Sequence, residues 1–170
     1  SAMDTALHAK ILDILDRWPD MTVATVRSDG APQATVVSFV HDGLRIYFGT
    51  GAQAQKAANI AREPRVSITV TAPYADWLHI EGVSLSGIAR EVTDAQEKTR
   101  VAELMIKRFP QLGLIPVTDP GDMKLFCVQP TMISVLDYTK GFGHTELVVV
   151  GPGDVAEAKG SVRHEWAKAS

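Results

Sequence analysis

The first apolar positions of the chain recur at intervals of three and four residues, the spacing of one face of an α-helix. Asp4 or Thr5 can cap the start of this helix, because a short polar side chain there accepts a hydrogen bond from the first turn. Pro19 marks its end, since the residue before a proline is driven out of the helical region. The face that this helix would bury consists of Leu7, Ile11, Ile14, Leu15 and Trp18.

After this helix the apolar period changes to two, the spacing of a half-buried strand. Met21–Arg27 and Pro32–His41 flank an Asp29-Gly30 turn, and Asp42-Gly43 leads into Leu44–Gly49. Asp-Gly between alternating runs is a strong hairpin signal. We therefore predict three consecutive strands in an antiparallel meander, because parallel strands would need long crossovers.

The rest of the chain combines two short helices with further strands. Residues 52–62 and 94–109 are typical of helices, and Gly82 and Gly87 indicate bends inside a long strand, by which a sheet can curl. The further strands are predicted at Arg65–Thr71, Asp76–Arg90, Met123–Gln129, Thr131–Asp137 and Glu146–Val150. The sequence thus predicts a mainly β fold with peripheral helices (α+β), in which six to eight antiparallel strands form a barrel.

We expect one domain over residues 1–150. Ser1-Ala2 is interpreted as a tag remnant and left out of the fold. After Gly153 the composition becomes charged and rich in alanine, which predicts a flexible tail of low order, or a marginal helix, over residues 151–170.

Composition argues against several classes of function. The formal net charge is −3 and no cluster of Lys and Arg is present, so we expect no nucleic-acid partner. No apolar run reaches the roughly 20 residues of a membrane helix. Cys127 is the only cysteine, and the five histidines lack the spacing of metal ligands, so neither a disulfide nor a metal site is expected. A cytoplasmic protein fits these features.

The junction between the strand ending near Gly49 and the following helix is the first candidate for chemistry. Gly49-Thr50-Gly51 resembles part of a dinucleotide fingerprint, but that motif requires a parallel β-α-β unit and a later acidic residue, both of which are missing. Backbone N–H groups, the Thr50 hydroxyl and Lys56 could still bind an anion at the start of the helix. The alternative is an ordinary turn with a solvated lysine.

A series of short motifs follows in order from the first hairpin onward. An Asp-Gly-x-Pro hairpin precedes an aromatic strand that ends at Thr50, Lys56 follows six residues later, and Asn-Ile and Pro-x-Val pairs close the series. This ordered set resembles the pyridoxamine 5′-phosphate oxidase-like superfamily of FMN-binding split β-barrels. The resemblance covers Met21 to Val92 well. It rests on Gly30–Gln33, Val36–Phe39, Asp42-Gly43, Ile46–Thr50, Lys56, Asn59-Ile60 and Pro64–Ser67.

The resemblance implies which residues would hold FMN. The backbone of Val36–Ser38 would line the flavin ring, and Thr50, Gln55 and Lys56 would bind the phosphate. Many family members carry Ser or Arg where this chain has Gln53 and Gln55, so we expect a weaker anchor with one cation fewer. The predicted cofactor-binding residues are Val36, Val37, Ser38, Phe48, Gly49, Thr50, Gln55, Lys56, Trp77 and His79.

The resemblance also implies a homodimer with its cofactor sites at the interface. Trp77 and His79 would approach the cofactor from the same chain or from the partner. The alternation of His79 with Leu78 and Ile80 favours a simpler interpretation, in which it is a histidine in the wall of a strand.

The leading hypothesis is an FMN-dependent oxidoreductase that acts on a small molecule. No catalytic residue can be named, because the cofactor itself would carry the redox chemistry. An F420-dependent reductase is an alternative, although its acidic cofactor would need more cations than this groove offers. A haem-binding or haem-degrading protein is another, with His144 or His164 as ligand. For His144, we favour the simpler interpretation of an exposed histidine in a turn. A flavin-binding module without turnover is the third.

Overall fold

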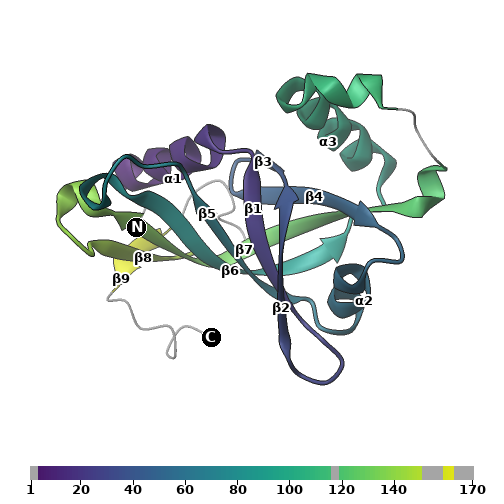
Figure 1. Ribbon diagram of the computed structural model, residues 1–170, viewed down its shortest axis with the longest axis horizontal. Helices are drawn as coiled ribbons and strands as arrows, with labels where there is room; N and C mark the ends of the chain where they lie inside the picture. The colour runs from purple at the N-terminus through teal and green to yellow at the C-terminus, as the bar shows by residue number, and fades with distance from the viewer. Residues whose placement is uncertain (1–3, 116–118, 151–158, 163–170) are drawn as a thin grey trace.

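The computed structural model describes residues 4–115 and 119–150, and the backbone of 159–162 (Figure 1). The helices are α1 (Thr5–Arg17), α2 (Gln55–Arg62) and α3 (Ala95–Arg108), with 3-10 turns η1 (Trp77–His79), η2 (Pro110–Leu114), η3 (Pro120–Asp122) and η4 (Tyr138–Lys140). The strands are β1 (Asp20–Val26), β2 (Pro32–Ser38), β3 (Val40–Asp42), β4 (Arg45–Gly51), β5 (Arg65–Thr71), β6 (Glu81–Glu91), β7 (Met123–Asp137), β8 (Thr145–Val149) and β9 (Lys159–Val162).

All strands belong to one curled antiparallel sheet with the order β2-β1-β5-β6-β7-β4-β3. β8 pairs with β7, and β9 pairs with β8. In Figure 1, α1 lies along one half of the sheet, and α2 and α3 lie near its other end. The predicted mainly β fold with peripheral helices is confirmed.

The predicted three-strand meander is only partly correct. Gly30 and Gly43 adopt positive φ angles of 85° and 57°, as the two Asp-Gly turns require. However, the predicted strand Pro32–His41 is interrupted at Phe39, whose N–H donates to the carbonyl of Pro19 at 3.0 Å. β2 therefore pairs with β1 at one edge of the sheet, and β3 pairs with β4 at the other edge. The chain between them joins both edges and so curls the sheet.

The glycine-based bend is confirmed at Gly87. The register between β6 and β7 shifts there, because Ser86 pairs with Met132 and Gly87 pairs with Pro130. Thr131 is thus the extra residue of a β-bulge. Two separate strands around Pro130 were predicted, but the bulge accommodates a residue without an N–H, and β7 runs through it as one strand.

The prediction of a strand from Asp76 onward is wrong for its first residues. Trp77–His79 forms the 3-10 turn η1, and β6 begins only at Glu81. The side chain of Asp76 accepts from the N–H of Leu78 at 2.8 Å and so caps the turn. This local hydrogen bond competes with strand formation, which is why the apolar alternation misleads here.

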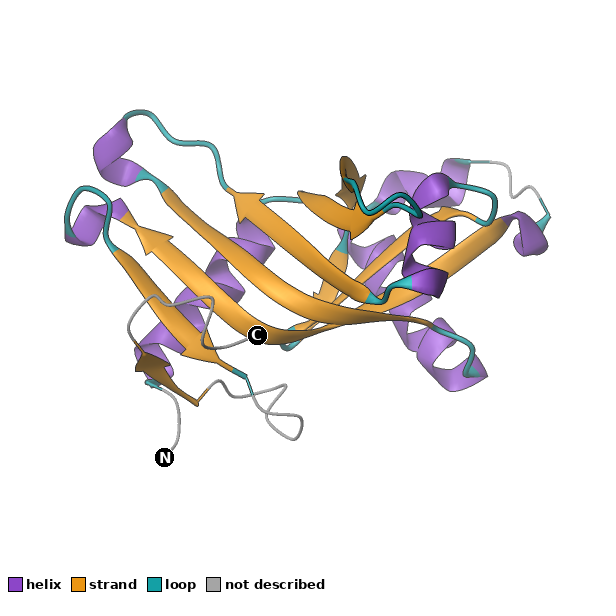
Figure 2. Ribbon diagram, turned by 90° about the horizontal axis from the view of Figure 1, so that it is seen from below, coloured by secondary structure: helices purple, strands orange, loops and turns teal. Residues whose placement is uncertain are grey.

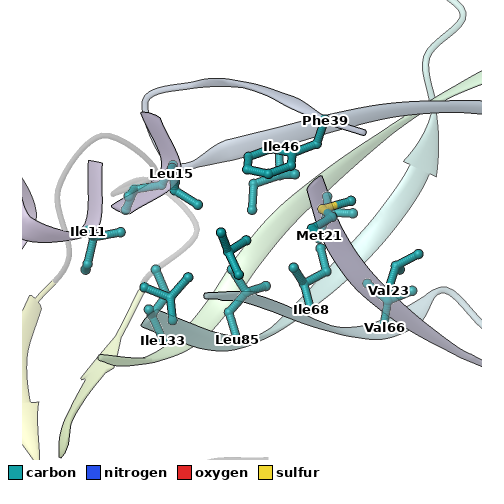
Figure 3. Packing of buried hydrophobic residues seen from close by; sticks show 14 of the residues in the cluster. Ile11, Leu15, Met21, Val23, Phe39, Ile46, Val66, Ile68, Leu85 and Ile133 are labelled. Carbon is teal, nitrogen blue, oxygen red and sulfur yellow. The ribbon is translucent and has the colours of Figure 1, made fainter. Parts of the chain in front are cut away.

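The main core fills the concave side of the sheet. Four of the five apolar positions predicted for the first helix are buried there, and Trp18 remains partly exposed. Figure 3 shows Ile11 and Leu15 of α1 in one cluster with Met21, Ile68 and Leu85 from the strands and with Phe39 between β2 and β3.

A second, smaller core lies on the opposite face of β4 and β7. Tyr47 and Cys127 alternate with residues of the main core and so point outward, where they pack with Val101 of α3. This cluster seats α3 on the outside of the sheet. No helix among the described residues is long and apolar enough to cross a membrane.

From residues 151–170, for which a flexible tail or a marginal helix was predicted, the structure describes only β9. The four residues of β9 form a strand that pairs with β8 rather than a helix. Its register shifts between Val148 and Val149.

Candidate functional site

The junction between β4 and α2 offers several hydrogen-bond donors close together. Thr50 is largely buried near the end of β4, and its hydroxyl forms no hydrogen bond within the described residues. Lys56, in the first turn of α2, forms no ion pair with any residue that the structure describes. The helix is preceded by Ala54, which has no side chain to cap it. An uncapped helix start beside a hydroxyl and a lysine is suited to an anion.

A buried amide network fixes this junction. Asn59 is fully buried, and its Nδ2 donates to Thr25 Oγ1 and to Gln33 Oε1, each at 3.0 Å. Its Oδ1 accepts from Gln55 Nε2 at 2.8 Å. Asn59 therefore ties α2 to β1 and β2. In the sequence, Asn59 stands out only as part of the Asn-Ile motif. Its Oδ1 already occupies the side-chain amide nitrogen of Gln55.

Gly49, the residue before Thr50, lines a groove of about 390 Å³ between β2, β4 and the helical segment that follows β6. Val37, Ser38 and Phe39 form one wall, and Gly49 and Met123 border it from β4 and β7. Gly49 pairs with Leu125 of β7, the strand next to β4 in the sheet. Met123 lies on the same strand, two residues before Leu125. The predicted residues Val37, Ser38 and Gly49 thus meet in one groove.

The other wall of the groove comes from the end of α3 and from η2. Met105, Phe109, Gln111, Leu112 and Ile115 line it. None of the described lining residues is charged. Ser38 Oγ donates to Asp20 Oδ1 at 2.7 Å, so this hydroxyl is already satisfied. No sequence motif marks this wall, because its residues resemble an ordinary amphipathic helix.

Two contacts hold α3 in place. Glu97 accepts two hydrogen bonds from Arg90, each at 2.8 Å, and one from the hydroxyl of Tyr47 at 2.9 Å. The bond from Arg90 lowers the pKa of Glu97, and burial is the main cause that raises the pKa of Tyr47. At the other end, Arg108 donates to the carbonyl of Leu15 at 2.8 Å and lies over the ring of Phe39 at 4.6 Å.

The remaining predicted residues near β2 and β4 have different environments. Val36 points outward from β2 and is 69% exposed. The side chain of Phe48 is fully buried in the main core, where its ring stacks on Phe126 at 5.5 Å. Only the backbone of Phe48 could therefore contact a cofactor.

Trp77 and His79 lie at the far end of the sheet. Thr50 pairs with Lys124 near the start of β7, whereas Glu81, two residues after η1, pairs with Asp137 at its end. Thirteen residues of strand separate these positions along β7, or roughly 40 Å at about 3.3 Å per residue. Within one chain, Trp77 and His79 therefore cannot reach the junction at Thr50.

The side chains at that far end have partners of their own. Trp77 stacks on Phe142 at 6.2 Å, and His79 Nδ1 lies 2.8 Å from Asp76 Oδ1. The nearby His144 Nε2 lies 3.0 Å from Glu146 Oε1. The other haem-ligand candidate, His164, lies outside the described residues.

The curled antiparallel sheet, closed at its edges through the β2–β3 segment, is that of a split β-barrel. A model of the pyridoxamine 5′-phosphate oxidase family matches residues 7–136. The chain belongs to this family, as its motifs predicted.

Several known proteins are similar to this chain. General stress protein 26 of Bacillus subtilis (strain 168) is 29% identical over 130 residues, which make up 70% of this chain and 87% of that protein. The structure of General Stress Protein 26 from Bacillus anthracis str. Sterne has a TM-score of 0.61 and 24% identity, covering 78% of this chain and 95% of that one.

A haem-binding protein from Mycobacterium smegmatis also has this fold. Its TM-score is 0.72 at 20% identity over 88% of this chain. This chain spans only 59% of that protein's length. At such identities, the two solved structures establish the shared fold alone.

Proposed function

We propose that this protein binds FMN and acts as an FMN-dependent oxidoreductase. The observation that carries the proposal is the donor set of Thr50, Lys56 and the start of α2, which has no partner among the described residues and follows directly on Gly49, a residue that lines the groove. A phosphate would accept hydrogen bonds from the Thr50 hydroxyl and from the first N–H groups of the helix, and Lys56 would supply the charge.

The remaining residues fit a flavin ring next to that phosphate. The backbone of Val36–Ser38 and Gly49 would carry the ring, since Gly49 has no side chain to obstruct it. FMN would supply the redox chemistry, whereas the protein contributes orientation and a partly dry groove. The apolar residues Val37 and Phe39 would exclude water from one side of the site.

The anchor is expected to be modest because it holds one cation. The amide nitrogen of Gln55 donates to Asn59, so the side chain of Gln55 adds little to phosphate binding. Its backbone N–H, at the first position of α2, would still face the phosphate.

The two cofactor alternatives receive less support from this geometry. A haem would need an axial ligand, but His41, His79 and His144 do not line the groove, and each lies beside a carboxylate. An F420-type cofactor would bring an acidic tail to a groove without charged lining residues in the described chain. The choice of FMN follows from this comparison.

We also propose a homodimer formed through the convex face of the sheet, opposite to α1 (Figure 2). Two rows of aligned residues cross β2, β1, β5 and β6 on this face without a charged side chain. They are Val36, Thr22, Thr69 and Ser84 in one row, and Ala34, Ala24, Ser67 and Ser86 in the other.

A two-fold arrangement of these faces would explain the distant position of Trp77. Two sheets packed face to face in opposite directions bring the η1 end of one chain toward the β4–α2 end of the other. Trp77, which is 67% exposed, would then approach the cofactor of the partner.

Equilibrium dialysis with FMN and with riboflavin tests the phosphate anchor. Wild-type protein should bind FMN more tightly than riboflavin, and Lys56→Ala should weaken FMN binding by at least about tenfold, or about 1.4 kcal/mol. The same substitution should leave riboflavin binding nearly unchanged, because riboflavin lacks the phosphate. Lys98→Ala on the exposed part of α3 is the matched control. Equal binding of FMN by wild type and Lys56→Ala would refute the anchor.

A further inference from the structure

We propose that the α3–η2 side of the groove binds an uncharged, largely apolar ring molecule, which would be the second reactant beside the flavin. This role as a reactant rests on the proposed FMN site. The binding of a neutral ring rests on the groove alone.

The side chains of the α3–η2 segment are sorted by charge. Met105, Phe109 and Leu112 line the groove. Lys107 and Arg108, from the same helix end, line a separate cavity of about 300 Å³. The helix therefore presents its apolar side chains to the groove and its cations elsewhere.

Two charged groups that contact lining residues, Arg108 and Asp20, are committed to other partners. Arg108 donates to the carbonyls of Leu15 and Trp18 at 2.8 and 2.5 Å, and its guanidinium lies over the ring of Phe39. Asp20 accepts from Ser38. A carboxylate or phosphate in the groove would therefore lose its water without gaining a charged partner among the described lining residues, which is unfavourable.

A neutral ring, in contrast, would cover apolar surface that the chain leaves open. Leu112, Ile115 and Met123 are 40%, 57% and 55% exposed, although all three line the groove. Removing such surface from water is the main driving force for apolar binding. Gln111 adds one neutral polar group to orient the ligand. The whole groove, of about 390 Å³, lies within the range of roughly 300–1,000 Å³ that is usual for small-molecule sites, and the flavin ring would occupy its β2–β4 side.

Two fluorescent probes with the same ring system test the proposal: 2-naphthol, which is neutral at pH 7, and 2-naphthalenesulfonate, which is an anion. Binding is measured by dialysis with the FMN-free and the FMN-loaded protein. Wild type should bind 2-naphthol at least about tenfold more tightly than the sulfonate. Leu112→Lys should weaken 2-naphthol binding by about tenfold and narrow or reverse this preference, because it places a cation in the apolar wall.

The control lies two residues away in the same turn. Leu114 is 86% exposed and does not line the groove, so Leu114→Lys should bind both probes as wild type does. Leu112→Met should also retain the preference for 2-naphthol, and matching thermal unfolding curves would show that the variants are folded. Equal binding of both probes by wild type, or unchanged binding by Leu112→Lys, would overturn the proposal.

The two proposals can fail separately. If dialysis shows no FMN binding but 2-naphthol still binds with the same dependence on Leu112, the neutral-ring site stands and the proposed FMN function falls. If FMN binds and 2-naphthol does not, the proposed FMN site stands and the neutral-ring site falls.

Discussion

Arg90 and Glu97 form a two-pronged ion pair, with both terminal guanidinium nitrogens 2.8 Å from the carboxylate oxygens. The pair joins the end of β6 to the first turn of α3. Because α3 carries one wall of the groove, this contact at its start helps to set the position of residues at its end.

Glu97→Gln should lower the free energy of unfolding by about 1 kcal/mol at pH 7, a small value because Arg90 is half exposed and screened by solvent. Arg90 lowers the pKa of Glu97 in the folded state below its ordinary value of 4.5. A lowered carboxyl pKa stabilises the fold above the unfolded pKa, and this contribution is lost as the pH falls through the folded pKa. Urea unfolding should thus show the largest difference from wild type at neutral pH, and this difference should shrink as the pH falls through the lowered pKa of Glu97.

Glu91→Gln is the control for this experiment. Glu91 is exposed and forms no ion pair within the described chain, so its substitution should not alter stability. A difference for Glu97→Gln that persists unchanged at low pH would contradict the assigned ion pair.

Asn59→Leu should destabilise the protein by about 3 kcal/mol, since it removes three hydrogen bonds and leaves the polar groups of Thr25 and Gln33 without this partner. It should also weaken FMN binding, because α2 loses its link to β1 and β2. Denaturant titration and FMN dialysis provide the two readouts. Gln53→Ala, at an exposed position before the same helix, should change stability by less than about 0.5 kcal/mol.

Gly87→Ala should destabilise the protein by about 1–3 kcal/mol through overpacking. A Cβ at this position would lie 2.6 Å from Val128 Cγ1 and 2.9 Å from the backbone oxygen of Gln129, and the backbone cannot easily move. Thermal unfolding measures the loss. Gly113→Ala is the control, because nothing lies within 4 Å of its added Cβ. Similar melting temperatures for the two variants would show that the bulge tolerates a side chain.

Val36→Glu tests the proposed homodimer. A charge within one of the two uncharged rows of the convex face should dissociate the dimer, because it would be buried without a partner. Sedimentation of wild type should show twice the chain mass of 18.4 kDa, and the variant should sediment as a monomer. The control is Ile106→Glu. Ile106 is also an exposed apolar residue, but it lies on α3, outside the proposed interface, so this variant should remain dimeric. A monomeric wild type would contradict the proposed interface.

The sequence predicts the elements better than their arrangement. The period of the apolar positions identifies α1, and the Asp-Gly turns identify two hairpins, because both signals are local. The break at Phe39 depends on a hydrogen bond to Pro19, and the continuity of β7 through Pro130 depends on the bulge at Gly87. Such pairings between distant residues leave no local pattern.

The candidate site shows the same division. Thr50 and Lys56 could be identified because the strand-to-helix junction places them near each other along the chain. The α3–η2 wall and the Asn59 network could not be predicted, since they arise from packing between separate elements. The turn at Trp77 was misread because Asp76 favours a local cap over a strand.

The route of the chain around the sheet also bears on how the protein folds. The β1–β2 and β3–β4 hairpins can form from neighbouring residues, but β4 must find β7, and Gly51 pairs with Met123 only after α2, β5, β6 and α3 have been traversed. This pairing closes a long loop and therefore carries a high entropic cost. Since Gly49 and Met123 both border the groove, an intermediate that contains only the local hairpins has no binding site, and ligand binding reports on completion of the sheet.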